Sequence, residues 1–299
     1  MAGHIAGILK PADCEVKKLM PATAAPVVVV AFSLCFRFDY TPSMGSRLRV
    51  LVLRAAGINC DEETAFAWRN AGAAVETAHV NRLVEQPRLL AEFQVLTIPG
   101  GFSYGDDIAS GKILSNQLVH HLGDDLGQFV ARGGAVLGIC NGFQVLVRMG
   151  LLPGSDCGVP CTLTLNDSGR YEDRWVTVRA TSPACVFLDP ETTFVFPVAH
   201  GEGKVLPAGG EDSITRLEAQ GRIALKYVSA DGNAPNFPAN PNGSIGNVAG
   251  LTDATGRILG LMPHPERNLF PAPPGCSTRD FNAETAGARF FRRAVQRLS

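Results

Sequence analysis

Residues 135–149, AVLGICNGFQVLVRM, pass from an apolar run into an amphipathic stretch within one short turn. This pattern predicts a buried strand over 135–139 and a helix from Gly142 onward. Cys140 falls where the strand stops, and Gly138 and Gly142 stand two residues to either side, as in a nucleophile elbow with cysteine in place of serine. Because a helix N-terminus stabilises a thiolate, the turn predicts a reactive thiol. The alternative is an inert cysteine that packs as a small hydrophobe.

The sequence on both sides of this turn alternates short apolar runs with longer amphipathic ones, which is typical of βαβ units. We expect strands at 49–53, 74–80, 93–98 and 258–262. One helix should start with Asp61 as its N-cap, and two further helices should span 115–132 and 283–298. Shorter strands of mixed pairing are expected at 174–179, 193–196 and 223–228. Residues 230–246, rich in Pro, Gly and Asn, are expected to form a loop. The predicted fold class is α/β: an open, mostly parallel sheet flanked by helices, with an additional mixed β part in the C-terminal half.

Residues 1–46 differ from the rest of the chain and are predicted to be a separate N-terminal extension, with one domain over 47–299. Four prolines interrupt the segment, and its apolar run at 27–36 is about half the length of a membrane span. A charged and aromatic stretch, RFDY at 37–40, stands where a secretory signal would need small residues. The interpretations left open are a disordered tail and a mis-assigned start, with Met44 as the true first residue.

Composition points to a small-molecule or protein partner. The 299 residues carry 27 Lys and Arg against 28 Asp and Glu, for a net charge of −1. Net charge therefore gives no electrostatic attraction for nucleic acid or for an anionic membrane. Eight cysteines without paired CxxC motifs indicate neither a disulfide scaffold nor a metal site. We therefore predict a reducing, cytoplasmic location, with no metal, nucleic-acid or membrane binding.

A proton shuttle for the thiol is predicted at His264 and Glu266, in the sequence MPHPE. Pro263 and Pro265 favour an extended backbone, in which alternate side chains face the same side, so the carboxylate could orient the imidazole. The histidine follows the strand 258–262, and Cys140 follows its own strand. Both should therefore meet at the carboxyl edge of a parallel sheet, where α/β folds bind ligands. An exposed loop histidine beside a surface glutamate is the alternative.

Donors for a developing oxyanion are predicted in the backbone at this same edge. Gly100 and Gly101 follow the strand 93–98 and offer N–H groups without side chains, and Asn141 offers the N–H directly after the nucleophile. A simple tight turn is the alternative for Pro99-Gly100-Gly101.

Taken together, these segments resemble the class I, triad-type glutamine amidotransferases, which have a flavodoxin-like core. The resemblance is closest to the separate glutaminase subunit of phosphoribosylformylglycinamidine synthase. It covers nearly everything from residue 47 onward and rests on GICNGFQ (138–144), GINCD (57–61), PGGFSYGD (99–106), RYEDR (170–174), AHGEG (199–203) and MPHPERN (262–268). Asparagine follows the cysteine here, where most members carry leucine.

The resemblance implies roles for individual residues. Cys140, His264 and Glu266 would form the catalytic triad, and the N–H groups of Gly101 and Asn141 would form the oxyanion hole. Glutamine would be bound by residues that match family motifs, namely Gly100, Gln144 and His200. Arg170, Arg174 and the loop 230–246 are candidates for contacts with substrate or partner.

The implied activity is hydrolysis of L-glutamine to glutamate and ammonia through a cysteine thioester. Ammonia would pass to a large synthase subunit that amidates formylglycinamide ribonucleotide in purine biosynthesis, in a complex where a small bridging subunit remains an open question. No cofactor is expected on this chain, which lacks a GxxxxGK[ST] phosphate loop, so ATP and Mg²⁺ are expected on the partner. Two alternatives are a stand-alone Cys-His peptidase or γ-glutamyl hydrolase, and a non-catalytic binding subunit.

Overall fold

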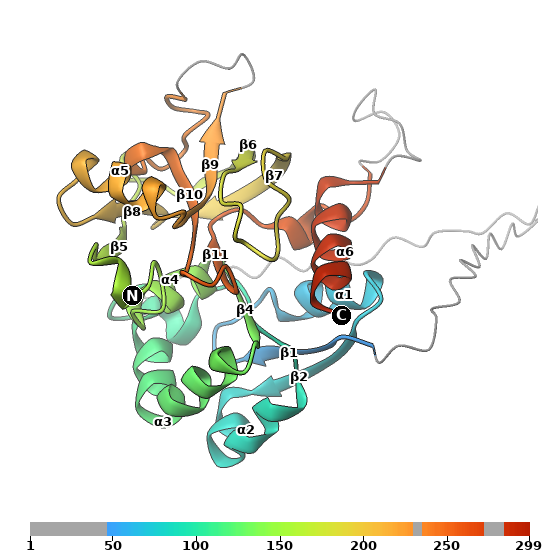
Figure 1. Ribbon diagram of the computed structural model, residues 1–299. Helices are drawn as coiled ribbons and strands as arrows, with labels where there is room; N and C mark the ends of the chain where they lie inside the picture. Colours follow the sequence, from blue (N-terminus) through green and yellow to red (C-terminus); the bar gives the residue numbers. More distant parts are fainter. Residues whose placement is uncertain (1–46, 230–234, 272–283) are drawn as a thin grey trace, which may run out of the picture. The chain divides into compact units, whose positions relative to one another are not determined.

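The computed structural model describes residues 47–229, 235–271 and 284–299 (Figure 1). The predicted N-terminal extension, residues 1–46, and the first part of the predicted loop 230–246 lie outside this range. The domain boundary at residue 47 therefore stays a prediction. Within the described ranges, no helix is long and apolar enough to cross a bilayer.

A nine-stranded sheet in the order β2-β1-β3-β4-β11-β10-β9-β6-β7 forms the centre of the fold. Its first five strands pair in parallel, as the βαβ alternation predicts. These are β2 (Ala74–His79), β1 (Arg49–Arg54), β3 (Val95–Ile98), β4 (Ala135–Ile139) and β11 (Ile258–Leu261). The register aligns Gly260 of β11 with Gly138 of β4, so the two strands end side by side.

The predicted mixed β part is confirmed, and it continues this same sheet. Beyond β11, every pairing is antiparallel, through β10 (Val248–Thr252), β9 (Ile223–Val228), β6 (Glu172–Ala180) and β7 (Thr193–His200). A separate antiparallel pair joins β5 (Cys161–Thr164) to β8 (Lys204–Pro207). The predicted α/β fold class, with a parallel core and a mixed addition, is therefore correct.

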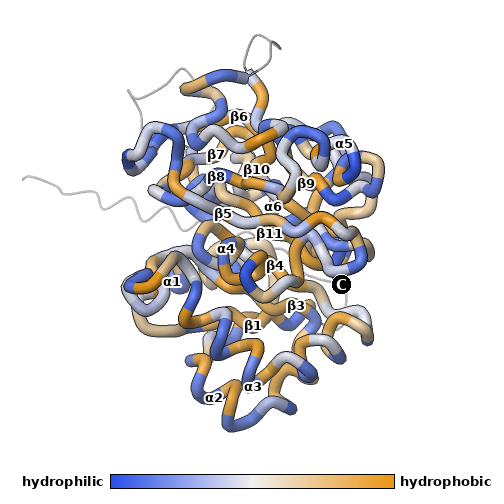
Figure 2. The backbone as a smooth tube through the Cα atoms, turned by 90° about the vertical axis from the view of Figure 1, so that its left-hand side faces the viewer, coloured by the Kyte–Doolittle hydropathy of each residue, from blue (hydrophilic) through white to orange (hydrophobic). Residues whose placement is uncertain are grey.

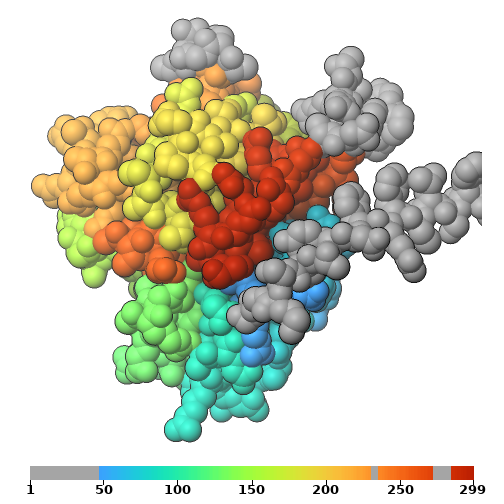
Figure 3. Space-filling view, turned by 45° about the vertical axis from the view of Figure 1, so that its right-hand side comes forward, coloured from blue at the N-terminus to red at the C-terminus, as the bar shows by residue number. Residues whose placement is uncertain are grey.

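Helices cover both faces of the parallel half. In Figure 1, α1 (Asp61–Asn70) and α6 (Ala286–Leu298) lie on one side of the strands, and α3 (Lys112–Ala131) and α4 (Asn141–Arg148) lie on the other. The short helices α2 (Val80–Glu85) and α5 (Glu211–Ala219) complete the set in the described part of the chain. Figure 3 shows α6 exposed on the surface next to the segment that contains β7 and to the N-terminal part that contains α1. Thr285 begins α6 by accepting a hydrogen bond from Ala288 N at 3.3 Å.

Two local expectations differ from the structure. Asp61 is not the N-cap of α1: Cys60 takes that position, and the Asp61 carboxylate instead pairs with Arg54 at 2.5 Å. The helix predicted over 115–132 begins one turn earlier, at Lys112, after Gly111 with φ of 72°. Both errors arise because a nearby tertiary contact or a left-handed glycine sets the helix start.

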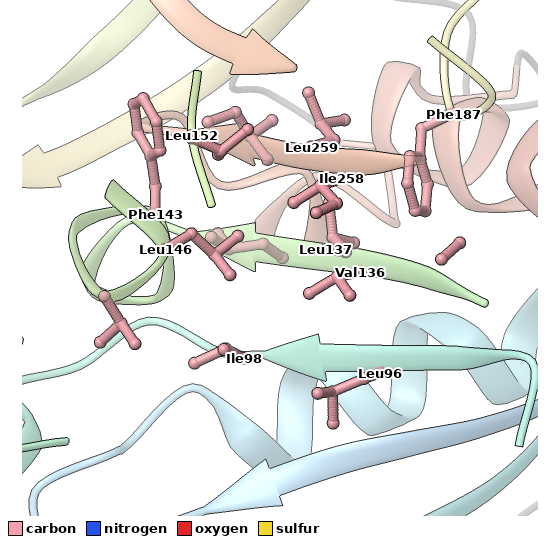
Figure 4. Packing of buried hydrophobic residues seen from close by; sticks show 14 of the residues in the cluster. Leu96, Ile98, Val136, Leu137, Phe143, Leu146, Leu152, Phe187, Ile258 and Leu259 are labelled. Carbon is pink, nitrogen blue, oxygen red and sulfur yellow. The ribbon is translucent and has the colours of Figure 1, made fainter. Parts of the chain in front are cut away.

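The core lies along the central strands, which Figure 2 shows as mostly apolar. Leu137 of β4 and Leu259 of β11 are fully buried and aligned in register, and at the ends of these strands Phe143 and Leu146 of α4 pack against the neighbouring Gly260 and Gly138 (Figure 4). Gly260 lets this packing occur, because a Cβ atom there would lie 2.1 Å from the Phe143 ring. The helix that begins at the predicted nucleophile is therefore seated directly on the strand that leads to the predicted histidine.

Replacing Gly260 with alanine should destabilise the fold by about 1–3 kcal/mol, because the Phe143 ring and Leu152 must move to admit the added methyl group. A Gly127→Ala variant is the control. Its Cβ meets nothing within 4 Å on α3, so it should stabilise by about 0.5–1 kcal/mol through helix propensity. Denaturant unfolding of both variants measures the difference, and equal midpoints for the two would contradict the packing argument.

Candidate active site

Cys140 occupies a sharp turn between β4 and α4. Its backbone has φ of 51° and ψ of −104°, a conformation that non-glycine residues rarely adopt. The glycines on either side are required by close approach: a Cβ at Gly142 would lie 1.9 Å from Ile98 O, and one at Gly138 would lie 2.6 Å from Leu146 Cδ1. The structure thus has the strand-turn-helix geometry that a nucleophile elbow needs.

The parallel pairing of β4 with β11 carries His264 to the same sheet edge. Cys140 N donates to Leu261 O at 2.8 Å, which extends the ladder between the two strands to the nucleophile position. Three residues after Leu261, His264 N donates to Pro197 O of β7 at 2.8 Å. The backbone at His264 is thereby joined to β7, in the antiparallel part of the sheet, just after the parallel strand β11.

His264 and Glu266 are in direct contact, although the backbone between them is not extended as expected. Residues Pro265–Arg267 form a 3-10 turn, and this turn folds the carboxylate back so that Glu266 Oε1 lies 2.6 Å from His264 Nδ1. Proline at the first helical position suits such a turn, which the sequence argument overlooked. Both side chains are almost fully buried, at 1% and 3% exposure. The exposed-loop alternative is therefore wrong.

The electrostatics of this pair favour an imidazolium. Burial alone lowers the pKa of His264, but the facing carboxylate of Glu266, together with Cys140, outweighs burial and raises that pKa well above its usual value. Nε2 of His264 is buried and makes no hydrogen bond within the described residues. With Nδ1 bound to the carboxylate, Nε2 is the atom left for proton transfer.

Gly100 lies at the centre of this group. A Cβ atom there would lie 2.9 Å from His264 Cε1, 3.2 Å from Cys60 Sγ and 3.4 Å from Cys140 Cβ. The two cysteines and the histidine therefore border one small space that only glycine leaves open. Burial raises the pKa of the Cys60 thiol, the opposite of what a nucleophile needs.

A metal could in principle be held by Cys60, His264 and Glu266, which each place a ligand atom within 4.8 Å of the other two. His264 already uses Nδ1 for Glu266, and Cys60 accepts a hydrogen bond from Arg267 Nη2 at 3.0 Å. These contacts engage His264 Nδ1, Glu266 Oε1 and the Cys60 sulfur, whereas His264 Nε2 and Glu266 Oε2 have no partner within the described residues.

The predicted oxyanion donors belong to two different segments, one at Gly101 and one directly after Cys140. Gly101 pairs with Ile58 in an isolated antiparallel bridge, in which Phe102 N donates to Gly57 O and Gly100 O accepts from Cys60 N. This pairing leaves the Gly101 N–H outside the ladder. In the second segment, the first hydrogen bond of α4 is Gln144 N to Cys140 O, so the Asn141 N–H is one of the unpaired amides of that helix N-terminus. Such N–H groups suit a developing negative charge.

A cavity of about 80 Å³ opens onto the thiol. It is lined by predicted residues, among them Gly101, Cys140, Gln144, His200 and His264, and by the side chains of Asp106, Tyr171, Glu202 and Arg267. Gly100 and Asn141 are not part of this lining, although Gly100 lies against His264. A small enclosure with polar walls fits an amino-acid side chain better than an extended peptide.

The remaining candidates divide into two groups. His200 is buried, its Nδ1 lies 3.1 Å from Asn166 Oδ1, and burial, together with the nearby His264, lowers its pKa to about 4, so it is neutral at pH 7. Gln144 donates through Nε2 to Glu202 O at 2.5 Å. Arg170 and Arg174 lie outside the cavity lining, and the Arg174 guanidinium instead pairs with Glu172 and stacks on Phe237.

Residue-based reasoning missed Cys60, Tyr171, Glu202 and Arg267 as members of the site. All four occur in the segments that resemble the family, but none has a spacing pattern of its own. Only the folded sheet edge brings these segments together, so the resemblance was the single signal that could have found them.

Comparison with known proteins gives consistent matches over the described domain. A family model described as a CobB/CobQ-like glutamine amidotransferase domain matches residues 47–296. The phosphoribosylformylglycinamidine synthase subunit PurQ of Dehalococcoides mccartyi is 43% identical over 84% of this chain and 98% of its own length. PurQ of Archaeoglobus fulgidus is 41% identical over 75% and 88%, respectively. The solved structure of PurLQS from Thermotoga maritima matches with a TM-score of 0.62 at 24% identity, covering 85% of this chain and 100% of that chain.

A Glu266→Gln variant should have a lower pKa at His264, because burial is then no longer opposed by the carboxylate. NMR titration of the imidazole measures this directly. The raised pKa of the native protein also contributes stability that is complete below about pH 6.5 and is lost as the pH rises through the folded-state pKa. The stability gap between native protein and variant should therefore shrink as the pH rises above about 6.5.

The matched control is Glu92→Gln, which removes an exposed carboxylate paired with Arg49 and should leave the His264 titration unchanged. An unchanged or higher pKa of His264 in the Glu266→Gln variant would show that the carboxylate does not set the charge of the imidazole.

Proposed function

The chain belongs to the PurQ family of phosphoribosylformylglycinamidine synthase subunits, within the CobB/CobQ-like glutamine amidotransferases, and from this premise we propose that it hydrolyses L-glutamine to glutamate and ammonia. The observation that carries the proposal is the buried Cys140–His264–Glu266 arrangement at one sheet edge, open to a small polar cavity. This geometry supplies a nucleophile, a proton shuttle and an orienting carboxylate in one place.

In the first half of the reaction, the Cys140 thiolate attacks the side-chain carbonyl carbon of glutamine. The carbonyl oxygen becomes an oxyanion, to which the backbone N–H groups of Gly101 and Asn141 donate. When the C–N bond breaks, His264 gives its Nε2 proton to the departing nitrogen, and ammonia leaves behind a γ-glutamyl thioester.

In the second half, His264 takes a proton from water, whose oxygen attacks the thioester. The C–S bond then breaks, the sulfur leaves as thiolate and glutamate is released. Throughout, Glu266 holds the histidine tautomer through Nδ1 and stabilises each imidazolium that forms. One glutamine and one water thus give one glutamate and one ammonia.

We further propose that the ammonia passes to a large synthase subunit, which converts formylglycinamide ribonucleotide to formylglycinamidine ribonucleotide with ATP in purine biosynthesis. ATP and Mg²⁺ would bind that partner, and assembly with a small bridging subunit belongs to the same proposal. A reducing compartment such as the cytoplasm suits the reaction, since Cys140 reacts as a thiolate. The near-complete coverage of a PurQ relative, together with the intact triad, supports this over a stand-alone hydrolase or a non-catalytic subunit.

Replacing Cys140 with alanine tests the nucleophile. In the complex with the synthase subunit, glutamine-dependent product should fall by at least about 10³-fold, while synthesis from added ammonia persists. Cys185→Ala is the control, because Cys185 is another buried free cysteine, outside the cavity lining, and should leave both activities unchanged. Loss of both activities in the Cys140 variant, with the control active, would indicate a structural role for Cys140.

The isolated chain should be a poor glutaminase that its synthase partner stimulates. The segment after Gly101 contains three consecutive left-handed residues, Tyr104, Gly105 and Asp106, a conformation that depends on its surroundings. Phe102 and Ile108 of this segment are 47% and 74% exposed, so a partner can contact the segment directly. Glutamate release, measured with and without the synthase subunit, its nucleotide substrate and ATP, checks this, and equal turnover would refute it.

A further inference from the structure

The Asn141 side chain, directly after the nucleophile, is 1% exposed and fully hydrogen-bonded. Its Oδ1 accepts from Ser103 N at 3.2 Å, and its Nδ2 donates to Asp106 Oδ1 at 3.1 Å and to Gln144 Oε1 at 2.9 Å. Because a backbone N–H can only donate, the atom that faces Ser103 must be the amide oxygen. The other two partners are acceptors, which fixes the nitrogen on their side.

These bonds join the nucleophile turn to the segment that follows the predicted oxyanion glycine. Asp106 has φ of 53°, and its Oδ1 also accepts from Gly111 N at 3.0 Å, so one carboxylate oxygen closes the loop and receives Asn141. Burial is the main cause that raises the pKa of Asp106. A half-buried carboxylate of this kind is costly to leave without its donors.

The same amide reaches the far wall of the cavity through Gln144. Gln144 receives its hydrogen bond from Asn141 and passes another to Glu202 O, in the turn after β7 that lines the cavity. A leucine at position 141 would make none of these three bonds. The Asn141 side chain thus connects both walls of the cavity to the backbone N–H that directly follows the nucleophile.

We propose that the Asn141 side chain is a positioning residue for the glutaminase reaction: it holds the loop 101–111 and Gln144 in register with the Cys140 thiol. This rests on the proposed function and deepens it. Since oxyanion donors act mainly in the transition state, loss of their alignment lowers kcat more than it raises KM. Through its exposed side chains, the loop also gives a synthase partner a route to the nucleophile turn.

The test uses the assembled complex and three variants of the Asn141–Asp106 pair. Asn141→Leu removes all three bonds and should lower kcat for glutamine by about 10- to 100-fold. Asn141→Asp keeps the acceptor for Ser103 but places a carboxylate oxygen about 3 Å from two other acceptors, Asp106 Oδ1 and Gln144 Oε1, so it should be at least as impaired. Adding Asp106→Asn to that variant removes the like charge and supplies an amide donor, and it should recover at least tenfold of the lost kcat.

Synthesis from added ammonia and the unfolding midpoint are recorded for every variant. Ser115→Ala, which removes one buried hydrogen bond to Lys112 O on α3, is the control and should change neither kcat nor KM. An Asn141→Leu kcat within twofold of native, or no recovery in the double variant, would overturn the proposal. A loss of ammonia-dependent synthesis equal to the loss of kcat would do so too, since it would indicate failed assembly.

The proposed function is judged separately in the same experiment. If the native complex releases no glutamate, the glutaminase assignment fails whatever the variants do. If the native complex is active and the Asn141 variants match it, only the positioning role fails.

Discussion

The backbone of Cys140, held at φ 51° and ψ −104°, is the constraint on which the rest of the site depends. Such a conformation persists only where the surroundings determine it fully. Three contacts do so here: the ladder bond from Cys140 to Leu261, the approach of Gly142 to Ile98 O, and the packing of Phe143 over Gly260. Because each contact joins α4 to a central strand, the turn is as rigid as the sheet itself.

Two buried histidines at this edge have opposite charge states because their partners differ. His264 faces the Glu266 carboxylate and is held as a cation at higher pH than usual, whereas His200, bound to the neutral Asn166, loses its proton near pH 4. The cationic His264 also opposes protonation of His200, because the two imidazoles lie close enough for His264 to lower the pKa of His200. The site therefore has one proton carrier and one neutral wall, set by the partner each ring contacts.

Local patterns were sufficient to predict the parallel half of the sheet and the meeting of Cys140 with His264, because both residues follow apolar strands that end at the same edge. Local patterns failed to predict the structure where tertiary contacts determine it. The short strands β5, β8 and β10 lack a clear alternation, and the 3-10 turn at Glu266 replaced the expected extended backbone. The position of Arg267 beside Cys60 depends on two segments about 200 residues apart, which no spacing rule connects.

The residue after the nucleophile shows how such a site resolves competing demands. Its backbone N–H must stay free for an oxyanion, while a buried polar side chain must find partners for every group or destabilise the fold. Asn141 meets both, because its amide is satisfied by Ser103, Asp106 and Gln144, away from the thiol. A network of this kind favours one arrangement of the loop relative to the nucleophile turn. Control of glutamine hydrolysis by a partner then requires only that the partner fix the loop.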